Sequence, residues 1–221
     1  MKRKYFKEFE RLRNLDRYCE KSIANHEKEV TEVISPLYHN WKNFAENELE
    51  ILLKKFGNIC RNETSVFREA ILSDNDLAET LLKIGDTFHE NNKILIQIVS
   101  SIHDMHARYK LEITNKIYQF FIKQTQNKKV NFFVSIFIAT YLSLFTNYEH
   151  IWKYIMSMPD ISPKKKSIDT FYTVINNNID IVPCELKTEI IKVFENYINK
   201  TSLHPYIVTQ YSTLIQKLKE K

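Results

Sequence analysis

The chain has 221 residues, of which 43% are hydrophobic and 27% are charged, and its formal net charge is +5. These proportions are typical of a folded protein with a buried core and exclude an intrinsically disordered chain. Only two glycines occur, and their scarcity disfavours both nucleotide-binding α/β folds and β folds with many tight hairpins. Three widely spaced cysteines without a C-x-x-C pair disfavour a disulfide framework and a zinc site.

The first predicted element is a long amphipathic helix over residues 6–60. Apolar residues recur every three or four positions from Leu12 to Ile59, which is the period of one helical face, and His26 falls in this row. Pro36 interrupts the pattern. Because proline removes a backbone donor, we expect a kink or a short break there.

A second helix is predicted from Leu77 to Phe120. Residues 73–76 have short polar side chains that can cap its start, and an apolar stripe then continues with one polar slot at Asn91-Asn92. A single helix of this length would span roughly 65 Å, which one compact partner cannot cover. The pattern therefore predicts that this helix lies along other long helices, in a coiled-coil-like bundle or a dimer.

Residues 124–129 are polar and basic and predict the turn at the tip of this bundle. Residues 130–148 follow without any charge, so their length makes them a candidate membrane span. Small or polar residues recur every four positions in this segment. That stripe suits close helix packing and favours a buried core or dimer-interface helix over a span.

The C-terminal part of the sequence predicts short helices. Residues 158–166 hold two prolines and a basic run and predict a loop. Three shorter helices are expected after this loop, over residues 168–179, 185–200 and 206–219.

No pattern in the sequence supplies an active site or a metal centre. His103 and His106 lie on one helical face, but the Glu-x-x-His pairs of di-iron bundles do not occur. No serine elbow, H-E-x-x-H or Walker sequence occurs either. We therefore expect no enzyme activity, no cofactor and no bound metal.

Basic residues provide the candidate binding site. The N-terminus combines Lys2, Arg3, Lys4 and Lys7 with an apolar edge, a pattern typical of segments that lie among lipid headgroups. The start of a bundle helix has the same pattern, so both interpretations stay open. The basic excess is small and no nucleic-acid-binding module is visible, so we expect no nucleic-acid partner.

The order of elements resembles the BAR (Bin/amphiphysin/Rvs) domain superfamily over residues 5–158. The stretch Leu52-Leu53-Lys54-Lys55-Phe56-Gly57 is similar to the end of the first BAR helix, and residues 76–85 with the long helix after them are similar to the second. The resemblance implies kinked helices that dimerise antiparallel into a curved bundle and bind anionic phospholipid. It places Lys110 and Lys116 on the concave face and Lys123, Lys128 and Lys129 at the tip.

The small size and A/T-biased composition also resemble the BAR-containing spore-wall proteins of microsporidia. That resemblance implies a spore-wall or plasma-membrane location for an otherwise cytoplasmic, peripheral protein.

We therefore expect an all-α fold: an elongated bundle of long kinked helices over residues 1–158, with short helices over residues 159–221 packed on it. The bundle is expected to form a homodimer through residues 130–155 and the stripe of the second helix. The residues expected at this interface are Phe88, Leu95, Ile102, Phe133, Phe137, Tyr141 and Leu144.

The expected function is a membrane-binding scaffold that senses or induces curvature. Two alternatives stay open. One is an adaptor or coat scaffold that binds proteins without lipid, and the other is a protein anchored by a span over residues 130–148.

Overall fold

The computed structural model describes residues 20–200 and 202–220, and the regular structure of these residues is helical, without a strand. The predicted all-α class is confirmed. Contacts divide the chain into two compact units, residues 1–126 (unit 1) and residues 127–221 (unit 2). The division falls at the predicted tip and not at residue 158, because residues 127–158 pack with the helices that follow them.

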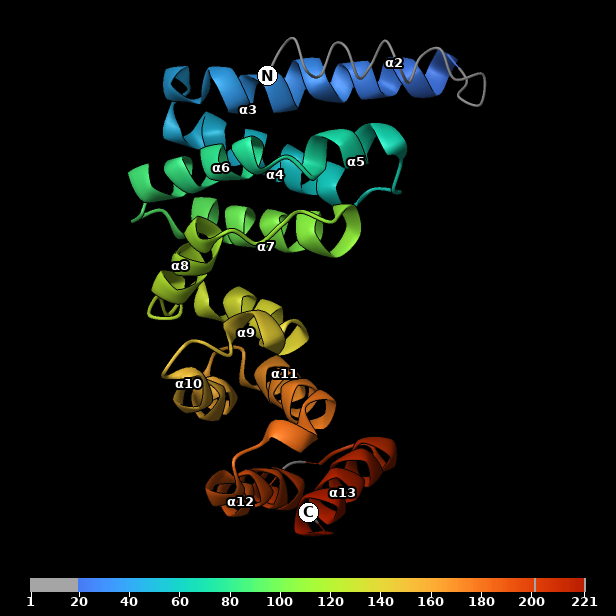
Figure 1. Cartoon of the computed structure of the whole chain (residues 1–221), viewed down its shortest axis with the longest axis vertical. Coiled ribbons are helices and arrows are strands. Elements are labelled where there is room, and N and C mark those ends of the chain that lie inside the picture. Colours follow the sequence, from blue (N-terminus) through green and yellow to red (C-terminus); the bar gives the residue numbers. More distant parts are fainter. Residues whose placement is uncertain (1–19, 201, 221) are drawn as a thin grey trace. The chain divides into compact units, whose positions relative to one another are not determined.

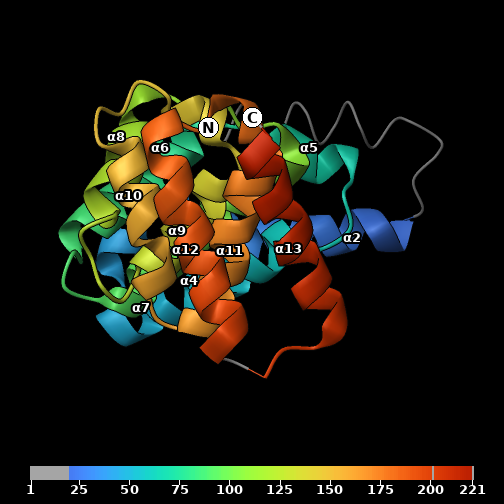
Figure 2. The same cartoon turned by 90° about the horizontal axis from the view of Figure 1, so that it is seen from below.

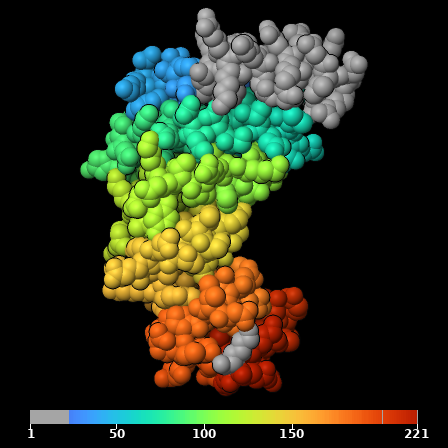
Figure 3. All heavy atoms as spheres, in the orientation of Figure 1, coloured from blue at the N-terminus to red at the C-terminus, as the bar shows by residue number. Residues whose placement is uncertain are grey.

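Unit 1 is a stack of antiparallel and parallel helices (Figure 1). Its elements are α2 (Glu20–Glu29), the π-helical turn η1 (Val30–Ile34), α3 (Ser35–His39), the 3-10 turn η2 (Trp41–Asn43), α4 (Glu46–Arg61), α5 (Val66–Leu72), α6 (Asn75–Thr87), α7 (Asn92–Tyr109) and α8 (Asn115–Gln124). α4 packs along α7, while α6 packs against α3, α7 and α8. In the space-filling view, the light-green residues that include α7 and α8 form part of the surface of unit 1 that faces the reader (Figure 3).

The chain stays helical through Pro36, where the sequence predicted a kink or a break. The π-helical turn η1 precedes the proline, and the Ser35 amide donates to the carbonyl of Val30, five residues earlier. This wider turn accommodates the missing proline donor without ending the helix. The first break comes at Asn40, where the backbone leaves helical geometry.

The prediction of one continuous helix over residues 77–120 is wrong, because three helices occupy this stretch. Asn91 causes the first break by capping α7: its side-chain oxygen accepts hydrogen bonds from the amides of Lys93 (3.0 Å) and Ile94 (3.1 Å). These amides therefore have partners without the preceding helical turn. The longest of the three helices, α7, has 18 residues and spans about 27 Å.

The second break lies between α7 and α8. Lys110 ends α7 in the left-handed conformation, with a φ of 60°. Thr114 then caps α8 by accepting a hydrogen bond from the Ile117 amide. The long second helix that supported the BAR resemblance is therefore absent, and the elongated antiparallel dimer stays a prediction.

We expect Asn91→Ala to lower the free energy of unfolding by about 1–2 kcal/mol, because the variant loses the α7 cap. It also loses the Asn91 amide's hydrogen bonds to Glu46 (2.6 Å) and Glu50 (2.7 Å) of α4. Urea denaturation followed by circular dichroism measures the change. Asn47→Ala, at an exposed position of α4, is the matched control and should shift stability by under about 0.5 kcal/mol. Equal losses in the two variants would contradict the capping role.

Unit 2 is also helical. Its elements are α9 (Asn131–Thr140), the 3-10 turn η3 (Leu142–Phe145), α10 (Ile151–Ser157), the 3-10 turn η4 (Met158–Asp160), α11 (Lys164–Asn177), the 3-10 turn η5 (Ile179–Ile181), α12 (Cys184–Lys200) and α13 (Pro205–Glu220). α11 packs against α9, α10 and η4, and α12 packs against α13 (Figure 2). The three predicted C-terminal helices agree with α11, α12 and α13. The basic run predicted in a loop instead forms the first turn of α11.

The structure does not support the alternative of a membrane span over residues 130–148. α9 has ten residues, about 15 Å, and the chain leaves the α-helix at Tyr141. A hydrocarbon core of about 30 Å needs roughly twice that length. In the described part of the chain, none of the helices combines the length and the hydropathy that crossing a bilayer requires. Val134, Phe137 and Ile138 are buried instead, so α9 is a core helix of unit 2.

An aromatic cluster holds the last three helices together. Phe171 of α11 stacks on Phe194 of α12 with ring centroids 5.3 Å apart, and Phe194 lies 5.0 Å from Tyr211 of α13. The Tyr211 hydroxyl donates to Asp169 at 3.0 Å. All three rings are buried, so each helix contributes to one shared core.

Candidate functional site

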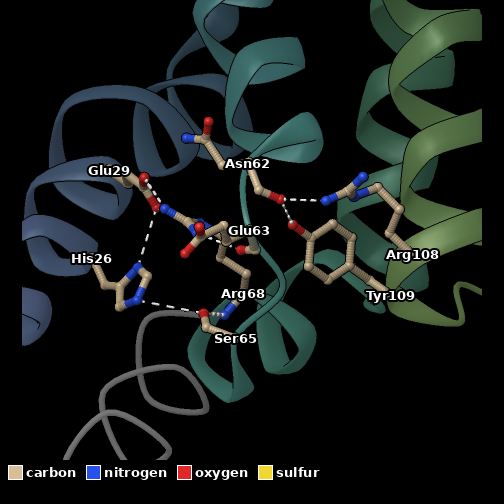
Figure 4. A network of polar contacts seen from close by, with 8 residues as sticks. All are labelled: His26, Glu29, Asn62, Glu63, Ser65, Arg68, Arg108 and Tyr109. Carbon is tan, nitrogen blue, oxygen red and sulfur yellow. Dashed lines mark hydrogen bonds and ion pairs between the residues drawn. The ribbon is translucent and has the colours of Figure 1, made fainter. Parts of the chain in front are cut away.

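A cluster of polar side chains joins α2, the loop over residues 62–65 and α5 (Figure 4). Ser65 is the N-cap of α5, and its hydroxyl accepts a hydrogen bond from the Arg68 amide at 3.2 Å. His26 of α2 lies between the segments. Its Nδ1 is 3.3 Å from Glu29, and its Nε2 is 3.4 Å from the Ser65 hydroxyl.

Arg68 and Glu29 form the strongest contact of this cluster. The guanidinium donates from Nε to Oε2 at 3.1 Å and from Nη2 to Oε1 at 2.7 Å, which is the bidentate arrangement. The side chains are only 14% and 19% exposed. Burial by itself raises the pKa of Glu29, but the hydrogen bonds from His26 and Arg68 and the Arg68 charge outweigh it, so the pKa lies below its ordinary value.

The order of contacts from Ser65 through His26 to Glu29 is the order in which hydrolases place nucleophile, base and acid. The surroundings do not fit that chemistry. Arg68 bonds both oxygens of Glu29, and the Ser65 hydroxyl already accepts the capping amide of α5. We therefore assign this cluster a structural role, which is to clamp α2 onto α5.

The same loop is fixed from its other side by α7. The carbonyl of Asn62 accepts hydrogen bonds from Arg108 at 2.7 Å and from the Tyr109 hydroxyl at 3.2 Å (Figure 4). Sequence reasoning missed this network, because the contacts that join its segments link residues 39 to 47 positions apart and share no motif. Only the place of His26 in the apolar row indicated that it would be buried, and it is 6% exposed.

The three predicted lipid-binding lysines that the structure describes in unit 1, Lys110, Lys116 and Lys123, make ion pairs with carboxylates of the same unit. Lys110 bonds Glu69 at 2.8 Å, and this hydrogen bond raises the lysine's pKa. The remaining two pairs are Lys116 with Glu79 at 2.8 Å and Lys123 with Asp86 at 2.9 Å.

The other predicted lipid-binding residues lie elsewhere. Lys128 and Lys129 are exposed at the start of unit 2 and make no ion pair with any described residue. Lys2, Arg3, Lys4 and Lys7 lie outside the described residues.

Charge is unevenly distributed along the chain. Residues 20–126 have 16 acidic and 13 basic residues, whereas residues 127–166 have two acidic and six basic residues. Residues 1–19 have three acidic and seven basic residues. Residues 20–220 together contain 24 of each kind, so the basic excess at the start of unit 2 is offset mainly by the acidic excess of residues 20–126.

The predicted dimer-interface residues fall into two groups. Leu95, Ile102 and Phe137 have no exposed surface in the single chain, so a partner could reach them only if the chain opened. The others retain exposed surface, with Leu144 at 37%; they are Phe88, Phe133, Tyr141 and Leu144.

Among the described residues, His103, His106 and Cys60 lie in structural surroundings. Burial lowers the pKa of His103, and the His106 ring bonds the Leu111 carbonyl at 2.7 Å. The Cys60 thiol is fully buried, and that burial raises its pKa, which makes it unreactive. Within residues 20–200 and 202–220, no group of three His, Cys, Asp or Glu side chains is placed to hold a metal ion.

No protein-family model, curated protein or solved structure matches this chain. Its function therefore has to be argued from its own residues.

Proposed function

We propose that this chain is a non-catalytic helical scaffold that attaches to anionic lipid surfaces at the cytoplasmic side of a membrane. The observation that carries the proposal is the concentration of basic residues in residues 127–166. Five lysines of this stretch are exposed and have no ion pair with a described residue: Lys128, Lys129, Lys153, Lys165 and Lys166.

Free lysines suit this role better than paired ones. A basic residue near an anionic leaflet contributes about 1 kcal/mol, so five of them suffice for reversible attachment. Lys110, Lys116 and Lys123 already have carboxylate partners, which reduces their attraction for lipid phosphate. We therefore propose Lys128 and Lys129 as the main lipid contact and the N-terminal basic residues as a second contact.

The double variant Lys128→Glu/Lys129→Glu should bind anionic vesicles at least about 30-fold more weakly, since two lost contacts amount to about 2 kcal/mol. Cosedimentation with phosphatidylserine-containing vesicles and with pure phosphatidylcholine vesicles, at low and high salt, measures this. The unchanged chain should bind only the anionic vesicles and should dissociate at high salt.

Lys192→Glu/Lys217→Glu is the matched control, because it makes the same charge change at two exposed lysines of unit 2 outside the basic stretch. Its binding should fall much less. A further variant, with the charges reversed at four N-terminal residues, measures the contribution of the N-terminus. These residues are Lys2, Arg3, Lys4 and Lys7. Equal losses of vesicle binding in the control and test variants would show that net charge alone explains the effect. That result would contradict a lipid site in residues 127–166.

A second candidate function is an adaptor that binds other proteins without lipid. It is favoured by the equal numbers of acidic and basic residues between positions 20 and 220. Absence of vesicle binding in every condition would support this candidate. BAR-type dimerisation and curvature sensing belong to the membrane proposal, and sedimentation equilibrium of the purified chain tests the dimer.

A further inference from the structure

A groove between α6 and α8 has no role in the proposed membrane attachment. The ion pairs Lys116–Glu79 and Lys123–Asp86 bridge the two helices with the same sequence offset of 37 residues, so α6 and α8 run parallel. The pairs are seven residues apart on each helix, about 10 Å along the axis. Residues of both pairs line a groove with a cavity volume of about 500 Å³.

The base of the groove is apolar. Leu82 of α6 and Phe120 of α8 line it. The Phe120 ring lies directly on Gly85, where a Cβ atom would come within 2.9 Å of two ring carbons. The other seven lining residues are polar or charged, so a narrow apolar base is surrounded by a polar rim. The volume lies in the range of sites for small ligands.

The rim carries one positive charge without a partner. Lys83 lines the groove, is exposed and makes no ion pair with any described residue. The carboxylates nearest to it along α6 are Glu79 and Asp86, and each already bonds a lysine of α8. Three lysines and two carboxylates therefore leave the groove with a net charge of +1.

We propose that this groove binds a single-chain amphipathic monoanion, such as a medium-chain carboxylate. The alkyl chain lies over Leu82 and Phe120, and the carboxylate pairs with Lys83. A single charge fits better than a phosphate dianion, because Glu79 and Asp86 repel additional negative charge. This site is independent of the lipid-surface contact proposed above, which uses basic residues of residues 127–166 and of the N-terminus and none of the groove residues.

Isothermal titration of the full chain with sodium decanoate, kept below its micelle concentration, tests the proposal. We expect binding of one molecule per chain, with amide shifts in α6 and α8 of the ¹⁵N-labelled protein. Acetate has the charge without the chain, octyl glucoside has a chain without the charge, and inorganic phosphate has excess charge. Each of these three should bind at least tenfold more weakly than decanoate.

Lys83→Gln should weaken decanoate binding at least tenfold, whereas Lys54→Gln, at an exposed lysine of α4 with no ion pair to a described residue, should leave it unchanged. Gln119→Trp places a large ring at the exposed rim of the groove and should also abolish binding. Decanoate binding that survives both Lys83→Gln and Gln119→Trp, or octyl glucoside binding of equal strength, would overturn the proposal.

Discussion

Arg68→Ala should lower the free energy of unfolding by about 2–4 kcal/mol, which is the largest effect expected of any single polar substitution in this chain. Removing one partner of a buried ion pair costs about 3–5 kcal/mol, because the remaining charge stays buried without a partner. The slight exposure of Arg68 and Glu29, 14% and 19%, lowers this figure somewhat. The variant also releases the Glu63 carbonyl, to which the guanidinium donates.

Denaturation followed by Trp41 fluorescence measures this loss, with Trp152 replaced by phenylalanine so that only unit 1 reports. The control is Lys28→Ala, which breaks the exposed pair between Lys28 and Glu32 at 3.9 Å. That pair is worth under about 0.5 kcal/mol. A loss after Arg68→Ala as small as the control's would show that the clamp does not stabilise unit 1.

The effect of Arg68→Ala should also depend on pH. The pKa of Glu29 is lower in the folded chain than its ordinary value of 4.5, so folding favours its ionised form. The stabilisation is therefore fully present above pH 4.5 and is lost as the pH falls through the lower, folded-state pKa. The difference between the parent chain and Arg68→Ala should shrink along the same range.

Gly85→Val should lower the free energy of unfolding by about 2–3 kcal/mol, because the added side chain overpacks the contact between α6 and α8. A Cβ at position 85 meets two carbons of the Phe120 ring at 2.9 Å, which is closer than packed atoms approach, so the buried ring or the two helices must shift. Urea denaturation measures the loss. The same shift should weaken decanoate binding, since Phe120 lines the groove.

Lys83→Val is the matched control for the stability measurement alone, because it places valine at an exposed position of the same helix and costs under about 0.7 kcal/mol by helix propensity. Adding Phe120→Leu to Gly85→Val should restore part of the stability, since the smaller side chain leaves room for the valine. Gly85→Val as stable as the parent chain would contradict the close contact between α6 and α8.

Features that depend on neighbours in the sequence could be predicted. The scarcity of glycine and the three-to-four spacing of apolar residues determined the all-α class, because only one face of each helix can be buried. The C-terminal helices were placed within a few residues, since Pro183 and Pro205 restrict the backbone locally. The small and polar stripe of residues 131–147 favoured a core helix, and α9 is one.

Features that depend on competition between local and distant contacts could not be predicted. The stripe from Leu77 to Phe120 fits one helix or three equally well, because each fold keeps the same apolar residues on a buried face. Caps at Asn91 and Thr114 decided between them, and Asn91 is also held by Glu46 and Glu50 of α4. The ion pairs of Lys110, Lys116 and Lys123 and the clamp between Arg68 and Glu29 could not be predicted for the same reason, because their partners lie far apart in the sequence.

The sequence by itself determined that this protein is helical, which residues form the apolar faces of its helices and where its basic residues are concentrated. Only the tertiary structure decided where the helices end and which lysines already have carboxylate partners. The physical reason is the distance along the sequence over which each effect acts. Periodicity and proline geometry act over a few residues, whereas the pairs Arg68–Glu29, Lys116–Glu79 and Lys123–Asp86 form between residues at least 37 positions apart, after the helices have packed.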